Sequence, residues 1–290
     1  MATSLSLFDL KPGNVLLGRY RIQQPHRESN MSATFSVEDD EHPGARYELQ
    51  AFPAAMFEGA QQAAAFAERM RPWCELETDA VLQMRDIRAL DDGAVVCVSD
   101  FPPGRCLRGW MAEEPRMGLD EVVELTSGLL RGLVQVHAAE LVHGDIKPAS
   151  IWFEPGAGRG TLVDAGVTPG MWAAKHLGTR TALIGTPYYA PIEQFSGDSP
   201  DALSDQYNLG TVMYELLTGV LPWTGKGYIE VFQSKMQEAP PAMRQMAPTV
   251  EVPRALEDVV ARSLRAKRRE RFASAADFLS ALESVELERA

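Results

Sequence analysis

The chain has 290 residues and a formal net charge of −12, with 45% hydrophobic and 23% charged residues, which is typical of a globular protein large enough for two lobes. This acidic balance excludes nucleic acid and anionic membrane surfaces as main partners, and no apolar run approaches the ~20 residues that a membrane span needs. The three cysteines form an odd, sparse set without metal-ligand spacing, so we expect reduced thiols and a cytoplasmic location.

The first hundred residues have the pattern of a small, mostly β lobe. Alternating polar and apolar residues between Tyr20 and Pro53 predict three antiparallel strands, with a turn at Glu41 to Gly44. The segment Ala54 to Arg71 is rich in Ala, Gln and Glu and predicts a helix, which ends before Pro72. A second hairpin is expected beyond it, with two strands and the turn Asp91-Asp92-Gly93: Val81 to Arg88 and Ala94 to Val98.

Beyond Pro102, Pro103 and Gly104, which predict a hinge, the hydrophobic period becomes helical. Leu119 to Ala139 predicts a long amphipathic helix, and Ser204 to Leu217 predicts a strongly apolar one with Gly219 as its C-terminal cap. Glycines and prolines between Thr168 and Ser199, and within Met236 to Met246, favour irregular structure. Three further helices complete the prediction: Tyr228 to Met236, Pro253 to Leu264 and Ser274 to Val285.

A central hairpin places two acids at its ends. The short apolar runs Ser150 to Phe153 and Thr161 to Val163 predict buried strands joined by a turn at Pro155 to Gly160. Asp145 lies just before the first run, and Asp164 lies just after the second. The two carboxylates are therefore expected to converge on one cleft.

Five stretches together resemble a protein kinase domain, most closely the bacterial Ser/Thr kinases of eukaryotic type. HGDIKPAS and DAG are similar to the family's HRDxKxxN and DFG loops, and the resemblance covers about Gly18 to Leu282. The other three resemble the end of the activation segment, the central helix and the last helix of the family: GTPYYAPIEQ, SDQYNLGTVMYELLTGVLPW and RERFASAADFLSAL. The resemblance implies an α+β, bilobal fold with a small β-rich N-lobe carrying one main helix and a larger helical C-lobe.

The domain prediction follows from this layout. Residues 1–18 are expected to be a lead-in, 19–101 the N-lobe and 102–290 the C-lobe of a single kinase-like domain. Three residues match structural positions of the family. Glu193 and Arg271 match the ion pair that fixes the activation segment, and Asp205 matches the acid that holds the backbone of the catalytic loop.

The expected N-lobe, whose residues hold the nucleotide in the family, departs from the family pattern. Kinases use a glycine-rich loop and a lysine on the third strand to hold the phosphates. Here non-glycine residues occupy the three glycine positions: Arg27, Ser29 and Ser32. Gln50 replaces the lysine, and its neutral amide cannot offset phosphate charge. The cations that could substitute are Arg27 and Arg46, and either Glu68 or Arg69 falls at the position of the family's helix glutamate.

The catalytic half is better preserved. By resemblance, Asp145 orients the substrate hydroxyl, Lys147 steadies the γ-phosphate and Asp164 binds the metal ion. Ser150 is a weaker second metal ligand than the family's asparagine. Ala165 replaces the DFG phenylalanine, and Gly144 replaces the HRD arginine. Ser99 falls at the back of the nucleotide pocket, and the activation segment offers three candidate phosphorylation sites: Thr179, Thr181 and Thr186.

We therefore interpret the chain as a pseudokinase, a kinase-like fold that regulates or scaffolds another protein, such as an active kinase or its substrate. Two alternatives stay open. One is a weak or atypical ATP-dependent Ser/Thr kinase that uses Asp145, Lys147 and Asp164, and the other is a nucleotide-sensing switch without phosphotransfer. No cofactor is certain, and ATP with Mg²⁺ is expected only where nucleotide binding persists. Since the glycines are also missing, Gln50→Lys alone is not expected to restore activity.

Overall fold

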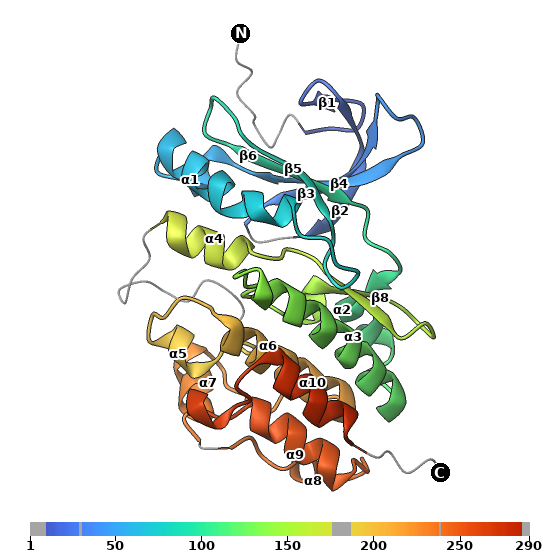
Figure 1. The fold of residues 1–290 in the computed structure, drawn as a ribbon, viewed down its shortest axis with the longest axis vertical. Coiled ribbons are helices and arrows are strands. Elements are labelled where there is room, and N and C mark those ends of the chain that lie inside the picture. Colours follow the sequence, from blue (N-terminus) through green and yellow to red (C-terminus); the bar gives the residue numbers. More distant parts are fainter. Residues whose placement is uncertain (1–9, 29–30, 176–186, 238, 286–290) are drawn as a thin grey trace. The chain divides into compact units, whose positions relative to one another are not determined.

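The computed structural model describes residues 10–28, 31–175, 187–237 and 239–285. The chain forms two compact units. The first combines the chain up to Glu77 with Leu82–Pro102 and a short segment that begins at Gly170. The second holds Thr78–Val81, Pro103–Pro169 and the remaining C-terminal part. Figure 1 follows the elements along the chain from blue to red.

The first unit is built on a six-stranded antiparallel sheet with the order β1-β2-β3-β4-β6-β5. The predicted three strands and the later hairpin are confirmed, and the sequence pattern missed β1. Leu90 N–H and Gly93 N–H close the hairpin turn through backbone hydrogen bonds. The strands are β1 Val15–Leu16, β2 Tyr20–Glu28, β3 Ala33–Asp39, β4 Arg46–Phe52, β5 Met84–Ala89 and β6 Val95–Asp100.

The predicted helix of this unit is shorter than expected. Helix α1 spans Ala60–Met70, whereas Ala54–Met56 forms a separate 3₁₀ turn (η2) and Arg71–Cys74 another (η3). The extended backbone of Phe57 interrupts the helical path, which is why the expectation of one helix from Ala54 was wrong. The inward side of α1 is apolar, and the ring of Phe66 lies 5.0 Å from that of Phe52 on β4.

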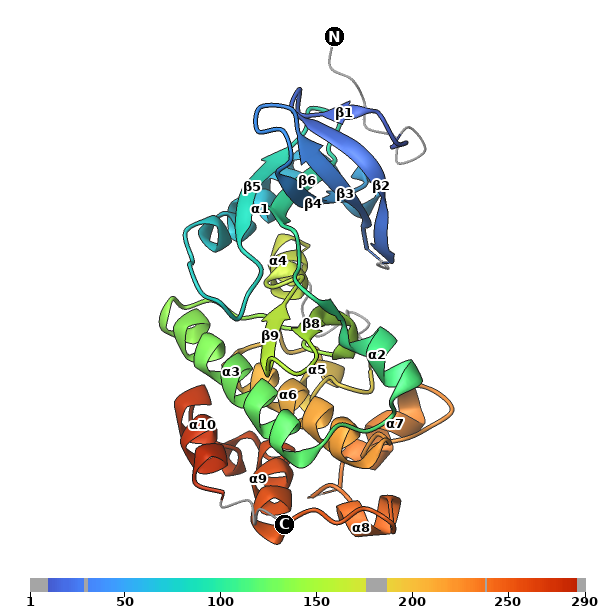
Figure 2. The ribbon, with the colours of Figure 1, turned by 90° about the vertical axis from the view of Figure 1, so that its right-hand side faces the viewer.

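The second unit is mainly helical. The long helix predicted from Leu119 is confirmed as α3, and Gly219 caps α6 in the left-handed conformation, with φ 77°, as predicted. Figure 2 shows α10 alongside α3. The pattern missed α2. The main helices are α2 Leu107–Glu113, α3 Leu119–Ala138, α6 Ala202–Thr218, α7 Tyr228–Lys235, α9 Arg254–Ser263 and α10 Ala275–Glu283.

The predicted central hairpin is confirmed in the second unit. Strands β8 (Ile151–Glu154) and β9 (Arg159–Leu162) pair antiparallel, and β7 (Arg105–Cys106) adds a third strand beside β8. The adjoining 3₁₀ turn η4 (Pro148–Ser150) leads into β8. Asp164 therefore lies two residues beyond the end of β9, as the sequence pattern predicted.

The expectation of irregular structure from Thr168 to Ser199 was wrong in two places. Helix α4 spans Val167–Ala174, and a one-turn helix α5 spans Ile192–Phe195. Pro169 is tolerated because it lies in the first turn of α4. Burial of Met171 and Trp172 outweighs the glycine and proline signal. A further single turn, α8 (Met243–Met246), lies in the other stretch predicted to be irregular.

The described part of the chain holds no helix that is both long and apolar enough to cross a bilayer.

Candidate functional site

One side of the first unit's sheet carries a row of buried polar side chains, here called the strand face. Gln50 pairs across the sheet with Thr34 on β3, and Glu48 pairs with Ser36 on β3 and Ser99 on β6. Directly opposed residues share a side of a sheet, and residues two apart on one strand share it too. The polar residues of the strand face are therefore Thr34, Ser36, Glu48 and Gln50, which are buried, and Ser99, which is half-buried.

The opposite side of the sheet is apolar. Leu49 on β4, Val37 on β3 and Val98 on β6 belong to the hydrophobic core of this unit, and all three are fully buried. Alternation along β4 thus sends Leu49 to the core and Gln50 to the strand face. Gln50 itself is only 8% exposed. The position that the family fills with a phosphate-binding lysine is therefore on the buried polar side.

Two of the predicted phosphate-binding residues, Gln50 and Ser32, contact each other, and a third, Arg27, contacts Thr34 on β3. The Gln50 side-chain amide donates a hydrogen bond of 2.8 Å to Ser32 Oγ. Thr34 Oγ1 accepts from Arg27 N–H at 2.9 Å and donates to Arg27 C=O at 2.5 Å. Gln50 is thus bonded to Ser32 and Arg27 to Thr34, whereas Ser29 lies outside the described residues.

Glu48 is a residue of the candidate site that sequence reasoning missed. Its carboxylate accepts two hydrogen bonds from the Arg27 guanidinium, at 2.8 Å and 2.7 Å, and lies 2.7 Å from His26 Nδ1. The side chains of Glu48, Arg27 and His26 are only 3%, 12% and 9% exposed. A signal for this pair was present, because an acid at an inward position of a buried strand requires a cation.

Arg46, the other cation that could replace the missing lysine, is also engaged. Its Nε donates to Ser36 Oγ at 2.8 Å, and its guanidinium carbon lies 3.5 Å from the ring centroid of Phe101. The ring centroids of Phe101 and His26 lie 4.4 Å apart, with the two planes tilted by 35°. Both arginines named from the sequence are therefore held by neighbours within the first unit.

Helix α1 offers no acid toward the sheet. Its buried residues are Ala63, Phe66, Ala67 and Met70. Glu68 pairs instead with Arg71 at 2.8 Å on the exposed side, and this pairing lowers the pKa of Glu68 below its usual range. Arg69 is also exposed. Neither residue left open by the sequence takes the inward position that the family's glutamate has.

The loop His143–Ser150, here called the catalytic loop, belongs to the second unit. Lys147 Nζ lies 2.5 Å from Asp145 Oδ2, with the two side chains 24% and 16% exposed. Ser150 is 1% exposed, and its hydroxyl accepts from Lys147 N–H at 3.0 Å while lying 3.2 Å from Asp145 C=O. The Ser150 hydroxyl thus bridges two backbone groups of the catalytic loop, and Asp145 and Lys147 form an ion pair.

Asp164 adopts a backbone conformation that only a few non-glycine residues take. Its φ is 63°, in the left-handed region, and the following Gly166 has φ 77°. Such conformations are strained and concentrate at functional sites. Gly166 N–H donates to His143 C=O at 3.1 Å, which ties the DAG segment to the catalytic loop.

Asp205 holds the catalytic loop from α6. Its buried carboxylate accepts from the backbone N–H groups of His143 and Gly144, at 3.0 Å and 2.7 Å, and contacts His137 Nε2 at 2.9 Å. His143 Nε2 in turn lies 3.0 Å from Val163 C=O, and burial lowers the pKa of His143. A neutral imidazole that donates through Nε2 fits this geometry.

Gly144 occupies the family's arginine position in a left-handed conformation, with φ 84°. A Cβ atom at this residue would lie 2.5 Å from Pro169 Cδ at the start of α4. Only glycine fits here without movement of a neighbour. The start of α4 is therefore packed directly against the catalytic loop.

The ion pair expected from the family pattern is present in the second unit. Arg271 donates to both carboxylate oxygens of Glu193, at 2.6 Å and 2.9 Å, and its side chain is fully buried. Tyr189 donates to Glu215 at 2.5 Å, and Arg108 contacts both residues. The predicted phosphorylation sites Thr179, Thr181 and Thr186 lie outside the described residues.

These features can be compared with known proteins. Residues 61–282 match the family model described as "Protein kinase domain". The chain belongs to the protein kinase family. It is 28% identical to the Ser/Thr protein kinase pkn3 of Myxococcus xanthus over 214 residues, which is 72% of this chain and 39% of that protein. It is also 28% identical to the Ser/Thr protein kinase PknA of Mycobacterium tuberculosis, over 80% of this chain and 54% of that protein. A probable Ser/Thr protein kinase of Lactococcus lactis, PknB, shares 26% identity over 86% of this chain and 39% of its own length.

The fold prediction is confirmed by solved structures. The kinase domain of Mycobacterium tuberculosis PknI aligns with a TM-score of 0.73 and 22% identity, over 94% of this chain and 98% of that domain. The kinase-family chain spans 39% to 54% of the length of the curated relatives named above.

Proposed function

We propose that this chain is a pseudokinase, a protein kinase homologue that acts by binding another protein as a scaffold or an allosteric regulator. The partner we expect is an active kinase or a kinase substrate, and the location we expect is the cytoplasm. The observation that carries the proposal is the buried pair of Arg27 and Glu48 on the strand face.

A nucleoside triphosphate needs cations, because phosphoryl transfer depends on positioning and charge neutralisation. Arg27 already directs two guanidinium donors at Glu48. To reach a phosphate, Arg27 would have to give up two hydrogen bonds to the buried carboxylate of Glu48, which would keep His26 beside it, and breaking such a buried pair costs about 3–5 kcal/mol. That carboxylate would also repel the incoming phosphates. The strand face therefore does not fit the triphosphate of the family's nucleotide.

Gln50 and α1 support the same proposal. Gln50 donates one amide N–H to Ser32, and a neutral amide offers no charge to the α- and β-phosphates. The pair that active kinases make between a strand lysine and a helix glutamate has no equivalent here, since Gln50 is uncharged and Glu68 pairs with Arg71.

The second candidate is a weak or atypical Ser/Thr kinase, which the catalytic loop favours. Asp145, Lys147 and Asp164 keep the residue types that position the substrate hydroxyl, the γ-phosphate and Mg²⁺. The relatives with the matching sequence are named as Ser/Thr protein kinases. Of the residues described, Asp145, Lys147 and Asp164 would fit the metal-bound phosphate end of ATP, and the strand face would not fit the rest.

A phosphotransfer assay separates the two candidates. We expect the purified wild-type chain and its Gln50→Lys variant to transfer no phosphate from ATP and Mg²⁺ to a generic protein substrate. Asp145→Asn is the matched control, because it removes the base but keeps the shape. Phosphate incorporation that is present in the wild type and lost in Asp145→Asn would overturn the pseudokinase proposal and establish the kinase. Strong transfer by Gln50→Lys would show that the missing lysine alone silences the chain.

A further inference from the structure

Helix α7 and its C-terminal cap expose a row of apolar side chains, here called the α7 stripe. The described part of the chain exposes five large hydrophobic residues, and three of them lie here: Tyr228 at 43%, Ile229 at 68% and Met236 at 59%. Phe232, which is half-buried, lies between them on the same side of the helix, because residues four apart share a face. Single exposed apolar residues are ordinary, whereas several in one patch mark an interaction surface.

The other side of α7 is anchored in the second unit, beside α5 (Figure 1). Val231 and Lys235 are both 1% exposed, and Lys235 Nζ donates to Tyr188 C=O at 2.8 Å. Toward α5, the Tyr228 hydroxyl donates to Phe195 C=O at 3.2 Å, and the two ring centroids lie 4.7 Å apart. The α7 stripe is therefore a preformed part of the surface.

The α7 stripe and the residues that flank it are uncharged. Gln233 and Gln237 continue the exposed surface on one side. Glu230, the acid of α7, falls on the opposite side by helical periodicity, and its carboxylate accepts from Lys226 N–H at 2.8 Å.

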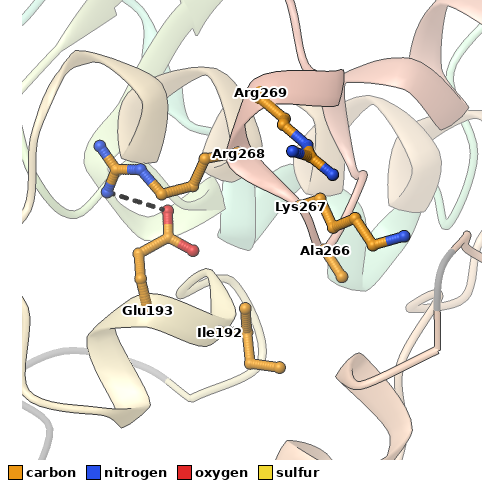
Figure 3. Close-up of a pocket in the computed structure, with 6 residues that line it drawn as sticks. All are labelled: Ile192, Glu193, Ala266, Lys267, Arg268 and Arg269. Carbon is orange, nitrogen blue, oxygen red and sulfur yellow. Dashed lines mark ion pairs between the residues drawn. The ribbon is translucent and has the colours of Figure 1, made fainter.

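Helix α5, which borders the α7 stripe, adds no available charge to it. Its acid, Glu193, is buried and lies 3.6 Å from Arg268, as Figure 3 shows. Arg271 donates to both carboxylate oxygens of Glu193. Phe195 is the residue of α5 that meets α7, with its ring centroid 5.5 Å from that of Phe232. On the described residues of α5 and α7, a partner recognised by its charge would therefore find no available counter-charge.

We propose that the α7 stripe is a self-association surface, on which α7 of a second copy of this chain packs antiparallel about a two-fold axis near Phe232. Two copies that each carry a net charge of −12 repel one another, so they can meet only where no like charges are buried. The uncharged stripe is such a place. The amides of Gln233 and Gln237 both donate and accept hydrogen bonds, so they can pair with their own copies at its edge. The inference goes beyond the proposed function, because it concerns contacts between copies of the chain.

The order of side chains along α7 is self-complementary. Tyr228, Phe232 and Met236 form one ridge of residues four apart, with Phe232 at its centre. In an antiparallel pair the two Phe232 rings meet, and Tyr228 of each copy faces Met236 of the other. A thioether sulfur packs favourably against an aromatic ring. A two-fold contact requires this kind of reciprocal pairing.

The exposed area sets the strength of the contact. The three exposed residues amount to fewer than two whole side chains, or about 250–400 Å², since a large side chain buries about 150–250 Å². A standard interface buries about 800 Å² per partner, so neighbouring residues must contribute as well. We therefore expect a reversible dimer with a Kd on the order of tens of micromolar.

The test is sedimentation-velocity ultracentrifugation of the purified full chain, without nucleotide, over concentrations that bracket the expected Kd. The test variant is Ile229→Glu/Met236→Glu, which places two charges on the most exposed side chains of the α7 stripe. The matched control is Val15→Glu/Val220→Glu. It adds the same charge at the other two exposed hydrophobic residues, which are 38% and 37% exposed and lie outside α7. The melting temperature of each variant checks that it is folded.

We expect the control to dimerise with the Kd of the wild type within about twofold, and the Kd of the test variant to rise at least about tenfold, because its dimer would bury unpaired carboxylates. Added NaCl should tighten the wild-type dimer, because salt screens the repulsion between acidic copies and leaves an apolar contact in place. A wild type that stays monomeric throughout would overturn the proposal and leave the α7 stripe to a different protein. An unchanged dimer in the test variant, equal losses in the two variants, or a dimer that salt dissociates would also overturn it.

The outcome is independent of the nucleotide question, because neither a nucleotide nor another protein enters the measurement. A monomeric wild type without phosphotransfer would remove this inference and leave the pseudokinase proposal intact. Phosphotransfer by a dimeric chain would do the reverse.

Discussion

On the strand face the charged side chains pair with one another, whereas the catalytic loop keeps acids and a lysine of the types that the kinase family has there. Glu48 faces Arg27 on the strand face, and Gln50 takes the place of a lysine. In the catalytic loop, Asp145 and Lys147 form an ion pair, and Asp205 fixes the backbone beside them. In our proposal, the fold has kept a loop that its architecture needs, while the charges of the strand face pair with each other.

This comparison also explains why retained residues are weak evidence for catalysis. Asp205 accepts hydrogen bonds from two backbone N–H groups of the catalytic loop, and Glu193 holds the buried Arg271. Both acids are needed for folding whether or not phosphate is transferred. Arg27 and Glu48 also form a buried pair, and in our proposal this pair keeps the Arg27 cation from binding a nucleotide.

The largest effect is expected from the ion pair of the second unit. Glu193→Ala should lower the free energy of unfolding by about 3–5 kcal/mol, because Arg271 would remain as a fully buried, unpaired charge. Arg131→Ala is the control, since its pair with Glu283 is 60% and 46% exposed and should contribute less than about 1 kcal/mol. Urea denaturation measures both. Similar losses in the two variants would show that the second unit does not depend on this pair.

Breaking the Arg27–Glu48 pair should lower the free energy of unfolding slightly less. The double variant should recover most of that loss, which is a pattern that identifies a coupled pair. Arg27→Met and Glu48→Leu should each cost about 2–4 kcal/mol, because each breaks the buried pair, and in Arg27→Met the Glu48 carboxylate keeps only His26 of the two neighbours described above. The double variant should return to within about 1 kcal/mol of the wild type, because apolar residues of similar size can replace a buried pair. Denaturant midpoints of the four proteins form a double-mutant cycle. Additive losses would mean that Arg27 and Glu48 are not coupled, and Arg27 would then be available to a nucleotide.

Gly144 gives a moderate effect that tests how tightly the catalytic loop is held. Gly144→Ala is expected to cost about 1–2 kcal/mol more than Gly156→Ala, because the added Cβ meets Pro169. Gly156 is the matched control, with a similar positive φ of 78° and open space around it. Thermal unfolding compares the two. Equal losses would mean that α4 does not press on the loop.

The smallest effect is expected from His143, as a dependence of the free energy of unfolding on pH. Burial lowers the pKa of His143 below its ordinary value of 6.5, so the unfolded chain binds a proton more readily than the folded one. Stability is therefore complete above that ordinary value and falls as the pH drops below it, by at most about 1.4 kcal/mol per pH unit. Denaturation of the wild type and His143→Gln from pH 7 to pH 5.5 measures the slope. Burial also lowers the pKa of Lys235, but that background is common to both proteins. An identical slope in the variant would contradict the assignment to His143.

The periodic elements could be predicted from the sequence because they depend on local pattern. The apolar stripe of α3 and the glycine that caps α6 are examples. Helix α4 could not be predicted, because burial of Met171 and Trp172 decides it against the local glycine and proline signal. The helix break at Phe57 could not be predicted either, because it comes from the extended backbone of that residue, which composition does not reveal.

The sequence predicted which residues form the candidate site, but not which of their side chains pair with each other. The sequence placed Gln50, Asp145 and Asp164 by motif. It did not reveal that Glu48 binds Arg27, because the two are 21 residues apart and meet only through the register of β2, β3 and β4. The inward direction of Glu48 follows from that register. Side-chain partners at this sequence distance depend on tertiary structure.

The most direct measurement of the central claim is a thermal-shift titration of the purified chain with ATP, with and without Mg²⁺, beside Asp164→Asn. A ligand at about 100 times its Kd adds about 2.7 kcal/mol of stability, which is an easily measured rise in melting temperature. We predict no rise at millimolar ATP, because Arg27 stays paired with Glu48. A rise without Mg²⁺ would replace the account with a nucleotide sensor. A rise that requires Mg²⁺ and disappears in Asp164→Asn would contradict it and show a working metal and nucleotide site.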